Sequence, residues 1–130
     1  MARIFSFRGK SIEELQALSF NDFAKLVKSR SRRALMRATP DYKELIKQAE
    51  KAKKDSSKKV IKTRLREAVI LPAWVDMKFG VHNGKEYKEV YIIPDMVGHR
   101  LGEFSYSTKR VMHSAPGIRA TRGSKFLAVK

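Results

Sequence analysis

The clearest local signal in the chain is Asn83-Gly84, which has alternating apolar residues on both sides. An Asn-Gly pair in this setting predicts a two-residue β-hairpin turn with both central residues at positive φ. The turn fixes a register in which His82 pairs with Lys85 and Lys78 pairs with Glu89. One face of the hairpin then carries the apolar residues Met77, Phe79, Val81, Val90 and Ile92. The chain must therefore fold around an antiparallel hairpin that buries this face.

Helix signals come before the hairpin. Ser11 and Glu14 form a capping box, and a second helix start follows at 19–22. The apolar spacing after that start predicts a helix that runs into the Arg-rich stretch 30–37. Thr39-Pro40 predicts an N-cap followed by proline at the first helical position. An apolar stripe at helical spacing follows, made of Tyr42, Leu45, Ile46 and Ala49.

The remaining signals complete an α+β fold. Val69-Ile70-Leu71 predicts a short strand that ends at Pro72, and residues 94–97 predict one helical turn that ends at Gly98. We therefore expect N-terminal helices, then a small three-stranded, mainly antiparallel sheet, and an extended basic C-terminal tail. The expected organisation is a helical basic region at 1–57 that ends in an Asp-Ser-Ser linker, a sheet core at 58–104 and a tail at 105–130.

The net charge of the chain is +16, from 29 Lys and Arg residues against 13 Asp and Glu residues. The excess includes three tracts without an acidic residue, at 28–37, at 58–66 and from Phe104 to the C-terminus. Self-repulsion of this size destabilises a compact state unless a counter-charge is present. The charge distribution therefore predicts a polyanionic partner.

Several classes of protein do not fit the sequence. The chain has no cysteine, which excludes a disulfide framework, a thiolate zinc site and a thiol nucleophile. The three histidines stand far apart without carboxylates at fixed spacing, so we expect no metal and no other cofactor. Gly9-Lys10-Ser11 is similar to the end of a phosphate-binding loop, but Ile4 replaces the glycine required five residues earlier. We expect no enzyme, no small-molecule substrate and no membrane span.

The basic residues favour RNA over other polyanions. Lys and Arg release counterions from phosphates, and Arg also stacks on bases. Backbone NH groups at the Asn83-Gly84 tip and at the Gly98 turn are candidate phosphate contacts, while Trp74 is expected in the core. Gly98 and Gly102 bracket a turn whose backbone approaches a ligand or a neighbouring chain closely. Acid-free tails on a small core suit a highly folded RNA. A free-standing basic DNA-binding protein is the alternative, because charge alone does not separate the two.

Three stretches carry a resemblance to a known family. They are Val81-His82-Asn83-Gly84-Lys85, Val90-Tyr91-Ile92, and residues 95–104 with the sequence Asp-Met-Val-Gly-His-Arg-Leu-Gly-Glu-Phe. Together they resemble the ribosomal protein S nineteen family of the small subunit (S fifteen in eukaryotes), over about residues 58–113. The tail, with Ala115-Pro116-Gly117-Ile118, resembles the archaeal and eukaryotic branch. Against the bacterial pattern, residues at about 40–57 look like an extension.

The resemblance implies a structural, rRNA-binding protein in the cytoplasm, in the head of the small subunit, bound to the 3′ major domain of the rRNA. It also implies ribosomal protein S thirteen as a partner, and a tail near A-site tRNA. The individual RNA contacts are chosen from the basic tracts, the hairpin tip, the Gly-bracketed turn and the tail. The candidates are Arg30, Arg32, Arg33, Lys62, Arg64, Arg66, Lys78, Asn83, Lys85, His99, Arg100, Lys109, Arg110, Arg119, Arg122 and Lys125.

Overall fold

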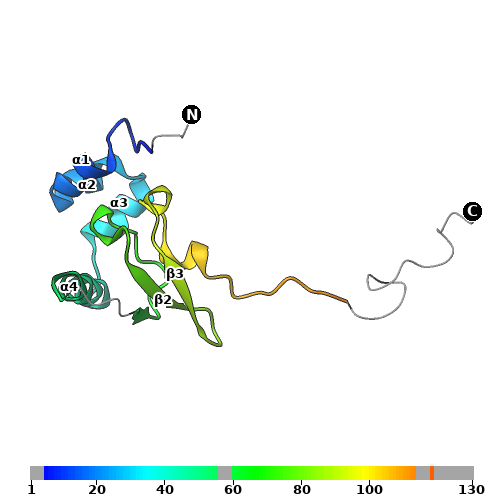
Figure 1. Cartoon of the computed structure of the whole chain (residues 1–130). Helices are drawn as coiled ribbons and strands as arrows, with labels where there is room; N and C mark the ends of the chain where they lie inside the picture. Colours follow the sequence, from blue (N-terminus) through cyan, green and yellow to red (C-terminus); the bar gives the residue numbers. More distant parts are fainter. Residues whose placement is uncertain (1–4, 56–59, 114–117, 119–130) are drawn as a thin grey trace, which may run out of the picture.

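Among the described residues, four helices precede the sheet along the chain, and residues 105–113 leave the body without regular structure (Figure 1). The structure is a computed structural model that describes residues 5–55, 60–113 and 118. The helices are α1 (Ile12–Ala17), α2 (Phe20–Leu26), α3 (Ser29–Met36) and α4 (Pro40–Lys54). The predicted α+β class is confirmed. Most of the predicted linker at 55–57 and of the tail beyond residue 113 lies outside the described residues.

Side-chain caps open three of these helices at the predicted positions. Ser11 Oγ accepts from the Glu14 NH group at 3.3 Å, and the Glu14 carboxylate accepts from the Ser11 NH group at 3.1 Å. Ser19 caps α2, and Thr39 caps α4 ahead of its N-terminal proline. Each cap satisfies an NH group that has no partner inside its helix.

One predicted helix is in fact two. The chain is extended at Val27 and Lys28, with ψ angles of 164° and 150°, so the helix that begins at Phe20 does not continue into the Arg-rich stretch. Arg32 stabilises this break by donating to the carbonyl groups of Ala24 at 3.1 Å and Lys25 at 2.9 Å. These carbonyls lie in the last turn of α2, where no intrahelical NH group reaches them.

The sheet has the strand order β1-β2-β3, with β1 at Ile61–Thr63, β2 at Lys78–His82 and β3 at Tyr87–Tyr91. β1 runs parallel to β2, and β2 runs antiparallel to β3. The prediction of three strands is confirmed, and the sheet is mixed because one of its two pairs is parallel.

The prediction of a strand at 69–71 is wrong. These residues are buried but form a single bridge, between Val69 and Arg100. A longer ladder does not form because Gly98, on the partner segment, has a φ of +81° and residues 101–104 coil into the 3₁₀ helix η3. The predicted turn at 94–97 is confirmed as a second 3₁₀ helix, η2 (Pro94–Met96), and a third, η1, spans Pro72–Trp74.

The hairpin is present, but its predicted register is wrong by two residues. His82 pairs with Tyr87 rather than with Lys85, and Lys78 faces Tyr91 rather than Glu89. A shift of two leaves every side chain on its predicted face, because side chains alternate with a period of two along a strand. The predicted apolar face is therefore confirmed: Phe79, Val81, Val90 and Ile92 are buried, and Met77 is half-buried.

Asn83 lengthens the hairpin loop. Its side-chain Oδ1 accepts from the NH groups of Lys85 at 3.0 Å and Glu86 at 2.9 Å. This local bonding is typical of Asn in turns and competes with the predicted two-residue turn. Gly84 has a φ of +103°, whereas Asn83 does not have the positive φ that the shorter turn requires.

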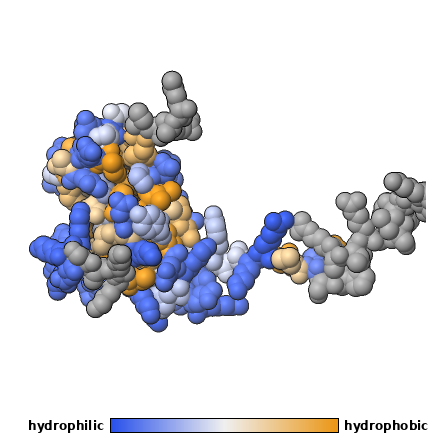
Figure 2. Space-filling view, viewed as in Figure 1, coloured by the Kyte–Doolittle hydropathy of each residue, from blue (hydrophilic) through white to orange (hydrophobic). Residues whose placement is uncertain are grey.

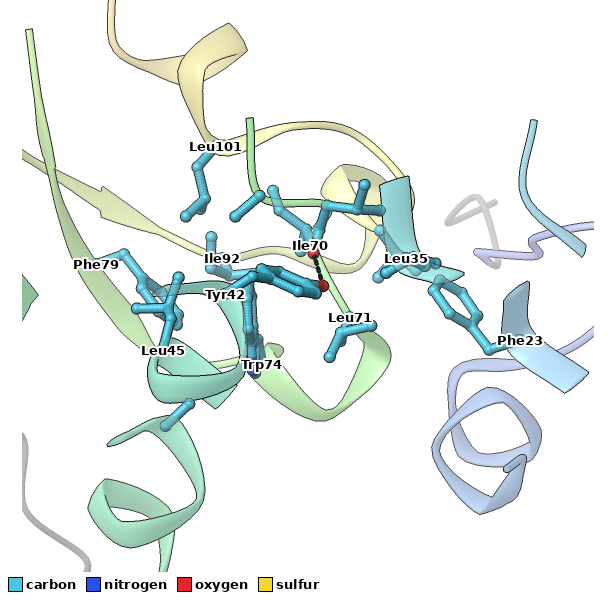
Figure 3. Packing of buried hydrophobic residues seen from close by; sticks show 14 of the residues in the cluster. Phe23, Leu35, Tyr42, Leu45, Ile70, Leu71, Trp74, Phe79, Ile92 and Leu101 are labelled. Atoms are coloured by element: carbon cyan, nitrogen blue, oxygen red, sulfur yellow. Dashed lines mark hydrogen bonds between the residues drawn. The ribbon is translucent and has the colours of Figure 1, made fainter. Parts of the chain in front are cut away.

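Trp74 lies at the centre of the core (Figure 3). Its ring centroid is 4.9 Å from that of Phe79 in β2 and 6.1 Å from that of Tyr42 in α4. The Tyr42 hydroxyl donates to the Val69 carbonyl at 2.9 Å, the bond dashed in Figure 3. Burial raises the pKa of Tyr42, so the hydroxyl keeps the proton that it donates. The helices and the sheet thus share one core.

Gly84→Ala is expected to lower the free energy of unfolding by about 1–2 kcal/mol, because a side chain disfavours positive φ. An added Cβ at Gly84 meets no atom within 4 Å, so the cost comes from the backbone alone. Urea unfolding followed by circular dichroism measures it. Lys85→Ala, an exposed change in the same loop, is the control and should stay within about 0.5 kcal/mol of the parent. Equal stabilities of the two variants would contradict this loop geometry.

Candidate nucleic-acid interface

Helix α3 carries three of the candidate arginines, and they have two different roles. All three are exposed and line a shallow hollow on this helix. Arg32 differs in that its guanidinium also donates to the Ala24 and Lys25 carbonyls and so holds the end of α2. No acidic residue occurs within α3. The helix therefore presents a cationic surface in which Arg30 and Arg33 are available to phosphates.

The outer face of the sheet forms a second cationic surface, built around an aromatic ring. The Lys62 ammonium of β1 lies 5.7 Å from the ring centroid of Tyr87 in β3. Arg64 Nε donates to the Tyr87 hydroxyl at 3.3 Å, and the His82 ring lies edge-on to Tyr87 with centroids 4.9 Å apart. Tyr91, 48% exposed, lies on the same face. Cations beside exposed aromatic rings are typical of surfaces that bind unpaired nucleotides.

Tyr87 and Tyr91 are absent from the candidate residues predicted from the sequence. The signal was present, because strand alternation places both tyrosines on the face of Lys78 and His82. The order of residues along the chain does not reveal that β1 joins this sheet. β1 pairs with β2 in parallel and brings Lys62 opposite Gly80. That pairing assembles the basic and aromatic residues into one surface.

The hairpin tip presents a cation rather than free backbone NH groups. Within the loop, the Asn83 NH group donates to the Glu86 carbonyl, and the Gly84 NH group donates to His82 Nδ1. The next two NH groups donate to Asn83 Oδ1. Asn83 is half-buried and holds the loop, while Lys85 is exposed. Of the two predicted tip residues, Lys85 is thus the one placed to reach a phosphate.

The turn between Gly98 and Gly102 also uses its NH groups internally. Those of Gly98, Leu101 and Gly102 donate to carbonyls of residues 66–70. The backbone at the two glycines does lie close to other atoms, as predicted, but these atoms belong to the same chain and not to a ligand or a neighbouring chain. A Cβ at Gly98 would lie 3.2 Å from the Phe7 ring, and one at Gly102 would lie 3.0 Å from the Arg66 carbonyl oxygen.

Two candidate RNA-binding residues of this turn have acidic neighbours. His99 Nδ1 lies 2.7 Å from Glu103 Oε2, and Arg100 lies 3.7 Å from the exposed carboxylate of Glu67. Burial alone would raise the pKa of Glu103, but the Arg100 NH group and His99 together lower it below its usual range. Glu103 is therefore ionised at neutral pH. Each pair has at least one partner that is half or more exposed, so water screens both contacts and each contributes little to stability.

Arg66 has a structural role, because its side chain links three segments of the backbone. Its guanidinium donates to the carbonyl groups of His82 at 2.7 Å, Gly102 at 3.0 Å and Ser105 at 2.6 Å. These carbonyls belong to the end of β2, to η3 and to the start of the tail. The buried Ser105 hydroxyl adds a bond to the Val81 carbonyl at 3.1 Å. The tail therefore leaves the body from a point that Arg66 fixes.

The remaining candidates lie along the outside of the chain. Lys78 is exposed on β2, and Lys109 and Arg110 are exposed on the segment that leaves the body. Figure 2 shows that this segment is largely hydrophilic where it leaves the body. This segment is anchored at its start, where Lys88 lies 5.7 Å from the ring centroid of Tyr106. Arg119, Arg122 and Lys125 lie outside the described residues.

Within residues 5–55, 60–113 and 118, no group of three or more His, Cys, Asp or Glu side chains is placed to hold a metal ion. No helix in that part of the chain is both long and apolar enough to cross a bilayer.

Comparison with known proteins gives consistent matches. The family model described as "Ribosomal protein S19" matches residues 32–113. Small ribosomal subunit protein uS19 of Metallosphaera sedula is 47% identical over 128 residues, which cover 97% of this chain and 91% of that protein. The protein of the same name in Saccharolobus solfataricus is 45% identical over equal shares. The family match begins within α3 and includes all of α4, so the residues predicted as an extension at 40–57 lie inside it.

Arg66→Gln is expected to lower the free energy of unfolding by at least about 2 kcal/mol, because three carbonyl groups lose a charged donor. Arg64→Gln removes the same charge two residues away, where the arginine is exposed and bonds only one hydroxyl in the described structure. It should cost less than about 1 kcal/mol. Thermal unfolding of both variants measures the difference. Equal destabilisation would show that Arg66 is not the structural member of the pair.

Proposed function

The chain belongs to the ribosomal protein S19 family, and on this premise we propose that it binds the rRNA of the small-subunit head, in the 3′ major domain. Its role there is structural: it is a small-subunit protein of the ribosome, and the proposal assigns it no reaction. The chain works within the cytoplasmic ribosome, where folded rRNA supplies the counter-charge for a net charge of +16.

The observation that carries the proposal is the outer face of the sheet. Lys62 of β1, Arg64 just after β1 and Tyr87 of β3 gather there, and the two cations lie beside an exposed ring. A lysine or arginine on this face neutralises a phosphate, while tyrosine offers a flat surface to an unpaired base. This combination suits RNA loops and bulges better than a regular DNA duplex, whose bases are stacked inside.

The finer assignments follow from the family resemblance. We propose ribosomal protein S thirteen as the protein neighbour and A-site tRNA as the molecule that the tail approaches. The described start of the tail fits a projecting role, since Lys109 and Arg110 lie on an exposed segment beyond the anchored Ser105.

The test compares binding of the full chain to an rRNA fragment of the 3′ major domain and to a DNA duplex of equal length. Fluorescence anisotropy at several salt concentrations gives the affinity and its salt dependence. We expect tighter binding to the rRNA at physiological salt. Equal affinity for the two nucleic acids would favour the alternative of a general DNA-binding protein.

A double variant, Lys62→Gln with Arg64→Gln, should weaken rRNA binding and lower the slope of log affinity against log salt by roughly 1.4–1.8, the value for two lost phosphate contacts. The control, Lys43→Gln with Lys47→Gln, removes the same charge from exposed positions of α4. If both variants weaken binding equally, the sheet face holds no special contact.

A further inference from the structure

A hollow between α3 and residues 65–69 brings together arginines that are far apart in the sequence. Its volume is about 400 Å³, within the usual range for small-molecule sites. Arg30, Arg33 and Arg37 come from α3 and its C-cap, and Arg100 comes from the Gly-bracketed turn. The spacing of three and then four residues puts the first three on one side of the helix. In Figure 1, α3 lies beside the segment that contains Arg100.

The rim of this hollow is strongly cationic. Glu67 is the one acidic residue among those that line it, against four arginines. Its carboxylate is 83% exposed and lies 3.7 Å from Arg100, so the pair is weak and solvated. Among the described residues, no carboxylate forms an ion pair with Arg30, Arg33 or Arg37. The hollow therefore holds an unbalanced positive charge at its edge.

The floor of the hollow is apolar. Ala34 of α3 and Leu65 are half-buried there, and the floor continues into buried residues such as Ala68. A cationic rim over an apolar floor matches a ligand that is flat and apolar on one part and anionic on another. A nucleotide has this form, because its base has an apolar face and its phosphates are charged.

We propose that this hollow binds one unstacked nucleotide of RNA, with the base against the Ala34 and Leu65 floor and the flanking phosphates on the arginines. Arginine suits both tasks, because its planar guanidinium stacks on bases and grips phosphate in a bidentate manner. An acidic peptide would satisfy the rim but would leave the floor exposed to water. The inference rests on the proposed function and adds a specific subsite to it.

Filling the floor tests the inference without changing the charge. Ala34→Phe places a ring in the hollow and keeps all four arginines. The control, Ala17→Phe, adds the same ring at an exposed position of α1. The probes are an RNA stem with one bulged adenosine and the same stem fully paired. Thermal unfolding of each variant confirms that it is folded.

We expect the parent and Ala17→Phe to bind the bulged stem about tenfold more tightly than the paired stem, which is the effect of stacking one base. Ala34→Phe should lose most of this preference for the bulged stem, and the part that remains comes from the Tyr87 face of the sheet. Should Ala34→Phe prove unfolded, Arg33→Gln with Arg37→Gln replaces it, and this pair should lose more affinity for the bulged stem than for the paired stem.

Three results would overturn the inference. The first is a parent that binds both stems equally. The second is a folded Ala34→Phe whose preference for the bulge equals that of the parent. The third is a parent that prefers a glutamate-rich peptide to the bulged stem and loses this preference in Ala34→Phe, which would make the occupant an acidic protein. None of the three touches the proposed function, which fails only if the parent does not prefer rRNA to duplex DNA.

Discussion

The contact of Trp74 with Tyr42 and Phe79 is the interaction on which the rest of the structure depends. It joins α4 to β2 in one aromatic cluster, and the Tyr42 hydroxyl fastens the cluster to the Val69 carbonyl. A chain with a net charge of +16 has strong self-repulsion and only a small core to oppose it. Because helices and sheet share that core, both cationic surfaces, the one on α3 and the one on the sheet, are held in a fixed relation.

The arginines of this protein divide into those that build the fold and those that face outward. Arg32 and Arg66 donate to carbonyl groups at the ends of α2, β2 and η3, where the backbone has acceptors without partners. Arg30 and Arg33 are exposed, as Arg32 is, but their side chains donate no hydrogen bond within the described residues. A basic tract in the sequence does not separate these roles, because they depend on which carbonyl groups lie within reach of each guanidinium in the folded chain.

Local chemistry was predictable from the sequence, and long-range pairing was not. The caps at Ser11, Ser19 and Thr39 appear as predicted because each depends on residues three positions away. Chain order did not reveal the parallel pairing of 61–63 with β2, nor the role of Arg66. Asn83-Gly84 does not form the expected two-residue turn. A turn of that kind is present at Arg8-Gly9, where both φ angles are positive and Phe7 forms a β-bridge with Lys10. The sequence therefore predicted basic residues such as Lys62 and Arg64 one by one, but not that the sheet brings them together on one surface.

The most direct test of the central claim is sedimentation of native cell lysate through sucrose gradients at low and high salt, with the protein followed by immunoblot. A structural protein of the small subunit should travel with that subunit and remain bound after a moderate salt wash, because contacts within folded rRNA are less screened than exposed ones. A protein that stays at the top of the gradient, or that follows DNA, would contradict the account and require another polyanion as its partner.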